Sequence, residues 1–142
     1  MEKLNFDIHA LPTPYIVVDE KKLVRNLEIL KSIIDQTGCR ILLAQKAFSM
    51  FSLYPLIGEY ISGTTASGLF EAKLGYEEMG KENHIFSPAY TEEEFDEILR
   101  ICGHIVFNSF SQWEKFKDKA IKSGKKFGIR VNPEISTQDH AI

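Results

Sequence analysis

The chain has 142 residues, of which 44% are hydrophobic and 26% charged, a composition typical of a folded globular domain rather than a disordered segment. The net charge of -3 is spread along the chain, so no basic cluster indicates binding to nucleic acid or to an anionic membrane surface. No apolar run is long enough to span a membrane, and the first residues lack a signal-peptide pattern. We therefore expect a cytoplasmic protein.

Short apolar or β-branched runs alternate with longer stretches of helical spacing. After an N-terminal run at 15–18, five runs occupy residues 41–44, 63–66, 84–87, 105–108 and 127–131. They recur roughly every 20 to 25 residues, the length of one strand plus one crossover helix, so we expect an α/β domain with a parallel sheet. Periodicity alone leaves open whether the sheet is a barrel or doubly wound. No glycine-rich phosphate loop follows the first strand, which argues against the common nucleotide-binding open sheets.

The stretches between these runs predict helices. Apolar residues at helical spacing form stripes within residues 23–34, 51–60, 69–79, 95–102 and 113–120. Asp19 is placed to cap the first helix. Thr91 with Glu94, and Ser111 with Glu114, have the spacing of capping boxes and predict where the last two helices begin.

The cysteines and two of the histidines show no pattern of a site. Cys39 and Cys102 are too few for a disulfide framework and make no metal-ligand pair, so we expect two reduced, buried thiols and no metal site. His84 and His104 are expected to precede their strands, which would place them at the amino-terminal rim of the sheet. We expect structural or solvent-facing roles for both imidazoles.

The opposite rim, at the carboxyl ends of the strands, is richer in polar residues. Loops and helix N-termini converge there in parallel α/β folds, and functional groups gather at that end. The residues expected at this rim are Lys46, Thr64, Thr65, Ser67, Ser87, Tyr90, Asn108, Ser109, Arg130 and Asn132. We therefore expect the functional site at the carboxyl rim.

Lys46 follows directly on an apolar run. Strand alternation puts it on the same face as Leu42 and Ala44, which is the inward face if the sheet closes. Alternation puts Gln45 on the opposite, helix-covered face, where its amide needs hydrogen-bond partners. A surface lysine that ends a strand is the simpler interpretation of Lys46 taken alone. The small Ala44, and the cation Arg130 on the same rim, favour a desolvated nucleophilic amine that suits a bond to a carbonyl carbon.

Several motifs carry a resemblance to a known family. They are TPYIVVD at 13–19, LLAQK ending at Lys46, GTTAS at 63–67 followed by Glu71, SPAY at 87–90 and GIRVNPE at 128–134. In this order and spacing the chain resembles the N-terminal part of the fold-type III pyridoxal-phosphate decarboxylases, and within them the carboxynorspermidine/carboxyspermidine decarboxylases. GTTAS with EAKLGYEEMGKE, together with SPAY, separates that group from diaminopimelate and ornithine decarboxylases. The resemblance extends from about Leu11 over almost the whole chain.

The resemblance implies a (β/α)8 TIM-type barrel of the alanine racemase and ornithine decarboxylase kind, of which this chain is the N-terminal portion with about five barrel strands. Residues 1–142 would be a partial cofactor-binding domain, and residues 1–19 would include a strand that in the family joins a C-terminal β-domain. The phosphate cradle and the other cofactor and substrate contacts lie downstream in the family. We therefore expect part of a longer or split enzyme that is inactive by itself.

The resemblance also implies pyridoxal 5'-phosphate as cofactor and assigns its contacts. Lys46 matches the lysine that bonds to the cofactor aldehyde, and Ala44 matches the small residue beneath the cofactor ring. Arg130 matches the arginine near the phenolic oxygen. Thr65 stands where many relatives have aspartate, which implies hydrogen bonding by a hydroxyl instead. Glu71 matches an acidic residue that supports the site indirectly.

The implied reaction is decarboxylation of carboxynorspermidine or carboxyspermidine in polyamine biosynthesis. The family implies a homodimer, and a complementary C-terminal chain is a further expected partner. Two alternatives stay open. One is a diaminopimelate or other basic amino acid decarboxylase, or a racemase, on the same scaffold. The other is a non-catalytic fragment that self-associates through the open edge of its sheet.

Overall fold

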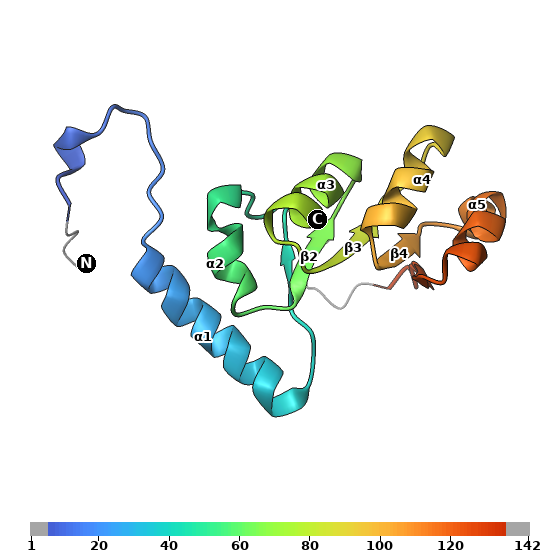
Figure 1. Cartoon of the computed structure of the whole chain (residues 1–142), viewed down its shortest axis with the longest axis horizontal. Helices are drawn as coiled ribbons and strands as arrows, with labels where there is room; N and C mark the ends of the chain where they lie inside the picture. Colours follow the sequence, from blue (N-terminus) through green and yellow to red (C-terminus); the bar gives the residue numbers. More distant parts are fainter. Residues whose placement is uncertain (1–5, 136–142) are drawn as a thin grey trace.

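The structure is a computed structural model that describes residues 6–135, so the predicted domain at 1–142 and the predicted strand-bearing segment at 1–19 extend beyond the described residues. The elements follow in chain order (Figure 1). They are η1 (Ile8–Ala10), α1 (Glu20–Thr37), β1 (Leu42–Ala44), η2 (Phe51–Leu53), α2 (Tyr54–Gly58), β2 (Gly63–Ala66), α3 (Leu69–Glu78), β3 (Glu82–Phe86), α4 (Glu92–Ile101), β4 (His104–Phe107), α5 (Phe110–Ser123) and β5 (Lys126–Ile129). Within the described residues, no helix is both long and apolar enough to cross a membrane.

The five strands form one parallel sheet in the order β1-β2-β3-β4-β5. A doubly wound sheet reverses its strand order at a switch point, whereas a barrel adds each new strand on the same side. Repeated right-handed crossovers in one direction also place the helices on one side of the sheet. Figure 1 shows α3, α4 and α5 along one side, from green to red. The predicted α/β fold is confirmed, and its strand order is consistent with part of a barrel.

The two faces of the sheet differ in burial. On the helix-covered face, Ile85, Ile105 and Phe107 are buried, and Phe95 of α4 stacks on Phe116 of α5 with ring centroids 4.2 Å apart. The opposite face, here called the inner face, is half-buried. Its side chains alternate along the strands with the buried ones and lie beside one another through the strand register. The inner face comprises Ala44, Thr65, His84, Phe86, His104, Val106 and Gly128.

A second apolar cluster joins α1 and α2 to the edge of the sheet. Tyr54 and Ile57 of α2 are buried in it, and Leu27 is the buried residue of α1. Partly buried Leu43 of β1 packs against the same cluster. This cluster lies behind the strand that precedes Lys46, so it fixes the position of that strand end.

The N-terminal run at 15–18 forms no β-strand among residues 6–135, and the predicted strand, whose neighbour is expected in a C-terminal β-domain, stays a prediction. A strand needs a neighbour for its backbone hydrogen bonds, and the five strands of the sheet pair only with one another. Ile16 is 88% exposed. The next prediction is confirmed, because α1 begins at Glu20 and the Asp19 carboxylate accepts from the backbone N–H of Lys22 at 3.2 Å.

The cysteines divide into one exposed and one buried thiol. Cys39 lies exposed between α1 and β1, so the prediction of a buried thiol is wrong there. Cys102 is buried at the end of α4, and burial raises the pKa of its thiol to about 12. Because the thiolate is the reactive form, we expect a thiol reagent near neutral pH to modify one cysteine in the folded chain and two in denaturant. Cys39→Ser should abolish the reaction of the folded chain; a remaining rapid reaction would show that Cys102 is accessible.

The start of α5 differs from the predicted capping box. Ser109 has the extended backbone of an N-cap, and its Oγ accepts from the backbone N–H of Gln112 at 3.2 Å. Ser111 already lies inside the helix, so its predicted capping role is wrong. By contrast, Thr91 caps α4 by accepting from the Glu94 N–H, as predicted.

This difference gives a matched pair of variants. Ser109→Ala is expected to lower the free energy of unfolding by about 1 kcal/mol, because an N–H of the first turn loses its acceptor. Ser111→Ala is expected to cost less than half of that. Urea unfolding followed by the fluorescence of the single tryptophan, Trp113, measures both. A larger cost at Ser111 would contradict the observed cap.

Candidate active site

Lys46 lies in a turn at the carboxyl end of β1. The strand ends at Ala44, and the backbone N–H groups of Ala47 and Phe48 both donate to the Ala44 carbonyl, at 2.9 and 3.3 Å. The alternation expected to point Lys46 inward therefore stops two residues before it. Lys46 is exposed. Its amine is therefore hydrated, whereas a desolvated amine was expected. Its predicted place at the carboxyl rim is nevertheless where the structure puts it.

Both ends of this turn are held by one hydroxyl group. The buried Tyr54 of α2 directs its Oη to the Gln45 side-chain oxygen and to the Phe48 carbonyl oxygen, each at 3.3 Å. Burial, with a smaller contribution from the Glu71 carboxylate, raises the pKa of Tyr54, so the phenol keeps its proton at neutral pH. The residues that flank Lys46 are thereby fixed to a helix.

Gln45 is 1% exposed and faces the helices, as predicted. Its side-chain oxygen has Tyr54 as partner, but its Nε2 has no hydrogen-bond partner among the described residues. A Cβ on Gly75 of α3 would come within 2.3 Å of Thr64 Oγ1 and 3.0 Å of that Nε2. Glycine at 75 therefore allows α3 to lie against the buried polar groups behind β1 and β2.

Ala44 and Thr65 are brought together. They are register partners on β1 and β2, and both belong to the half-buried inner face. Thr64 points the other way, where it is buried and donates from its hydroxyl to Asn83 Oδ1 at 3.1 Å. Thr64 is thus part of the interior and not open at the carboxyl rim as expected, whereas Thr65 presents its hydroxyl on the inner face.

Glu71 lies in the first turn of α3. Its Oε2 accepts from the backbone N–H of Ser67 at 2.6 Å, which ties the loop after β2 to the helix that follows. A carboxylate at this end of a helix is also stabilised by the positive end of the helix dipole. The observed contact is one that holds a rim loop in place.

Arg130 follows β5 and reaches over the inner face. Its backbone N–H donates to the Phe107 carbonyl at 2.9 Å, and its guanidinium carbon lies 5.2 Å from the centroid of the Phe86 ring. Lys46 and Arg130 therefore lie at the same rim but at opposite edges of the sheet. Three strands, β2, β3 and β4, lie between β1 and β5. The expected effect of Arg130 on Lys46 stays a prediction.

Tyr90 is buried behind the carboxyl rim. It is buried, and its hydroxyl donates to the Val106 carbonyl at 2.9 Å. Burial raises the pKa of this phenol well above its usual value. The backbone N–H of Ser87 donates to this hydroxyl at 3.2 Å, so Tyr90 lies near the carboxyl ends of β3 and β4 as predicted, but as a buried side chain. Ser87, in the same loop, is half-buried and donates from its hydroxyl to the Ala89 carbonyl.

A second polar cluster lies at the other end of the strands. His84 is inside β3 and His104 begins β4, so neither precedes its strand as expected. They are register partners with ring centroids 4.5 Å apart, and His84 Nε2 lies 2.7 Å from Glu82 Oε1. The hydrogen bond from His84 is the largest cause that lowers the pKa of Glu82. Burial, then the proximity of His84, lowers the pKa of His104.

The sequence contains one sign of this cluster. His84 and His104 occupy equivalent positions in successive strand-helix repeats, and Glu82 lies two residues before His84 on the same strand face. The register between the two strands, which brings the rings together, is not visible in the sequence.

Known proteins match the chain over nearly its whole length, although no family model does. It is 39% identical over 126 residues to the carboxynorspermidine/carboxyspermidine decarboxylase of Herminiimonas arsenicoxydans, and 43% identical over 126 residues to that of Campylobacter jejuni. It is 35% identical over 129 residues to the carboxyaminopropylagmatine decarboxylase of Synechocystis sp.. The crystal structure of the C. jejuni carboxynorspermidine decarboxylase with norspermidine matches with a TM-score of 0.84 at 42% identity. The predicted resemblance is confirmed.

These matches cover 89 to 92% of the chain. The chain spans about a third of the length of the carboxynorspermidine/carboxyspermidine decarboxylases it matches, 34% and 32% of the two curated relatives and 35% of the solved chain. The parallel strand order and the rim that carries Lys46 thus belong to a segment whose fold is that of part of a decarboxylase.

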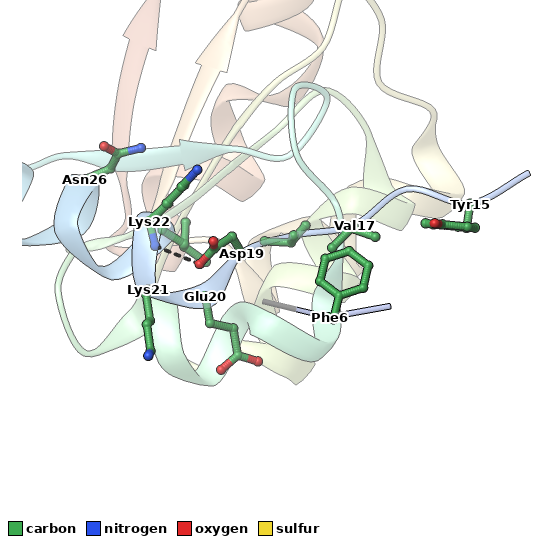
Figure 2. A pocket seen from close by; sticks show the side chains of 10 residues that line it. Phe6, Tyr15, Val17, Asp19, Glu20, Lys21, Lys22 and Asn26 are labelled. Carbon is green, nitrogen blue, oxygen red and sulfur yellow. Dashed lines mark hydrogen bonds between the residues drawn. The ribbon is translucent and has the colours of Figure 1, made fainter. Parts of the chain in front are cut away.

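A groove of about 880 Å³ lies elsewhere, between the N-terminal segment and the start of α1. Figure 2 shows Phe6, Tyr15 and Val17 along it, and the Asp19 carboxylate bonded to the Lys22 N–H. It contains none of the residues that the decarboxylase resemblance assigns to the cofactor. We therefore place the candidate site at the strand ends and not in this groove.

Proposed function

We propose that this chain supplies the lysine-bearing part of a pyridoxal-phosphate-dependent decarboxylase that acts on carboxynorspermidine or carboxyspermidine. The similarity to the C. jejuni carboxynorspermidine decarboxylase, at 42% identity and a TM-score of 0.84, carries this proposal. Because the chain spans about a third of that enzyme, the activity belongs to an assembly that includes further polypeptide. Cytoplasmic location, a homodimer and completion of the site by a C-terminal chain are parts of the same proposal.

The residues at the rim fit the proposed cofactor. The Lys46 amine is exposed in a turn that is held at both ends, and Ala44 beside Thr65 leaves only small side chains on the adjoining inner face. Arg130 adds a cation at the same rim. Such residues suit a flat aldehyde with an acidic phenol. When bound, pyridoxal phosphate accepts the electron pair that departing carbon dioxide leaves behind.

The chain's own residues have distinct tasks in this proposal. Lys46 would hold pyridoxal phosphate through its amine, because a primary amine condenses reversibly with an aldehyde and releases water, and the same amine could carry a proton at this site. Thr65 would donate a hydrogen bond from its hydroxyl to the bound cofactor, and Arg130 would stabilise the cofactor's negative charge. Glu71 acts at one remove, by holding the Ser67 loop at the rim.

A second substrate is favoured by one specific match. The Synechocystis relative, at 35% identity, is a carboxyaminopropylagmatine decarboxylase. The names of the relatives mention three substrates: carboxynorspermidine, carboxyspermidine and carboxyaminopropylagmatine. Each of these names describes a polyamine-like molecule with an added carboxyl group. The substrate class is thus a carboxylated polyamine, and carboxyaminopropylagmatine is the second candidate within it.

A graft tests the proposal. The segment of the C. jejuni decarboxylase that matches this chain is replaced by the corresponding residues of this chain, and release of carbon dioxide is measured with each of the three substrates. We expect cofactor-dependent release from at least one of them, with the unmodified C. jejuni enzyme as positive control.

The ungrafted 142-residue chain serves as the comparison. We expect it to release no carbon dioxide, since it matches only about a third of the enzyme. A folded graft that binds the cofactor but leaves all three substrates intact would refute the proposed substrate class. A self-associating chain that never retains cofactor, alone or in the graft, would favour the non-catalytic alternative.

A further inference from the structure

The polar cluster at the amino ends of β3 and β4 has the composition of a metal site. Glu82 and His84 lie on the same face of β3, and His104 is the register partner of His84 on β4. The three ligand atoms, one carboxylate oxygen and two imidazole nitrogens, all lie within 4.8 Å of one another, and all three residues are half-buried. We propose that Glu82, His84 and His104 bind a divalent transition-metal ion, with Zn²⁺ as the ion that fits best.

The donor atoms support this choice. Two imidazole nitrogens and one carboxylate oxygen, with solvent in the fourth position, form an established type of open zinc site. With ligands about 2.1 Å from the ion, neighbouring donors in a tetrahedron stand about 3.4 Å apart. The 2.7 Å between His84 Nε2 and Glu82 Oε1 and the outer limit of 4.8 Å lie on either side of that value. Binding of an ion would require the side chains to adjust toward that spacing.

The backbone beneath the cluster is already ordered. His84 lies on β3 and His104 lies on the adjacent parallel strand β4. The backbone hydrogen bonds between these strands fix the positions of both Cα atoms before an ion binds. Arg40, in the segment before β1, forms an ion pair with Glu82 Oε2 and leaves Oε1 directed at His84. Such a partner in the outer shell orients the carboxylate ligand.

Two cations oppose binding and limit the affinity. Arg40 is paired directly with Glu82, and Lys126 of β5 is the register partner of His104. The Arg40 side chain is 63% exposed, so solvent weakens its repulsion of an ion. The single carboxylate and the two imidazoles provide the attraction that must exceed this repulsion.

This site is separate from the lysine rim. Glu82 begins β3 and Ser87 follows its other end, which puts about 16 Å of strand between them. An ion here would join β3 to β4 at the amino end of the sheet, and through Glu82 it would act on Arg40. The proposal does not depend on the proposed decarboxylase function.

The test uses the full 142-residue chain without a histidine tag. Co²⁺ is titrated while its visible d–d absorption is followed, and Zn²⁺ is then added to displace it. We expect tetrahedral Co²⁺ bands that Zn²⁺ abolishes at one equivalent. His84→Ala and His104→Ala should each weaken Co²⁺ binding by more than about 100-fold, the upper end of the effect of outer-shell partners.

The chain offers a matched control, because it has four histidines. The double variant His9→Ala/His140→Ala removes as many imidazoles as the cluster contains and is expected to keep the bands unchanged. Absence of the bands in the unmodified chain, or their loss in this double variant, would overturn the proposal. Unchanged binding in folded His84→Ala or His104→Ala would do the same.

If the His84→Ala or His104→Ala variant does not fold, metal binding is tested on the unmodified chain instead. Ring nitrogen resonances of the four histidines are recorded by NMR, with His9 and His140 assigned from the control variants. Zn²⁺ should shift the two remaining rings and leave the assigned pair in place. Shifts confined to His9 and His140, or no shifts, would contradict the site.

Discussion

Lys46→Ala in the grafted decarboxylase is expected to lower the rate of carbon dioxide release by at least about 1000-fold, the scale of losing a covalent catalytic group. The residue is exposed and lies in a turn outside the apolar clusters, so its loss should not destabilise the fold. Single-turnover assays with saturating cofactor measure the rate. Borohydride reduction followed by peptide mass analysis shows whether the cofactor is attached, and at which of the chain's lysines.

Two further variants separate the possible roles of this amine. Lys46→Arg keeps the positive charge but is not expected to bond to an aldehyde, so it should be as inactive as Lys46→Ala. Lys21→Ala removes an exposed lysine on α1 and should have the parental rate. Activity within tenfold of the parent in Lys46→Ala, or attachment of the cofactor at a different lysine, would contradict the assignment of Lys46.

Gly63→Ala is expected to lower the free energy of unfolding of the chain by about 4 kcal/mol. Gly63 begins β2 with φ at 157°, a conformation that side chains rarely adopt. A Cβ there would lie 1.9 Å from the Glu82 carbonyl oxygen and 2.7 Å from its carbonyl carbon. Since those atoms belong to the backbone of β3, the only relief is to separate two strands of the sheet. Urea unfolding followed by circular dichroism gives the value.

Gly103→Ala is the matched control. A Cβ at Gly103, just before β4, meets no atom within 4 Å, so its cost should stay within about 0.5 kcal/mol. Equal stability of the two variants would show that β2 and β3 do not approach as closely as described. Loss of strand signal in Gly63→Ala alone is the expected pattern.

Much of the fold follows from periodicity. Apolar runs at regular intervals predicted five strands, and the helical stripes predicted what lies between them, because burial of one face dictates both patterns. The run at 15–18 has the composition of a strand but has no neighbour within the sheet. Composition reports which residues suit a strand, whereas pairing decides whether one forms.

The site was predictable in its position but not in its local geometry. The order of motifs placed Lys46 and Arg130 at one rim, as the strand bounds confirm. The exposure of Lys46 was missed because alternation does not tell where a strand stops, and here the chain turns after Ala44. The cluster at His84 and His104 was missed for a related reason. Contacts across strands depend on register, which a single sequence does not display.

The contact between Tyr54 and the turn around Lys46 has a consequence for the order of folding. The hydroxyl and both of its acceptors lie within residues 45–54, so this arrangement closes only a short loop. Contacts between residues close in sequence form with little loss of chain entropy and need no distant partner. The turn that carries Lys46 is thus held by a local contact, which is able to form before strands far along the chain have paired.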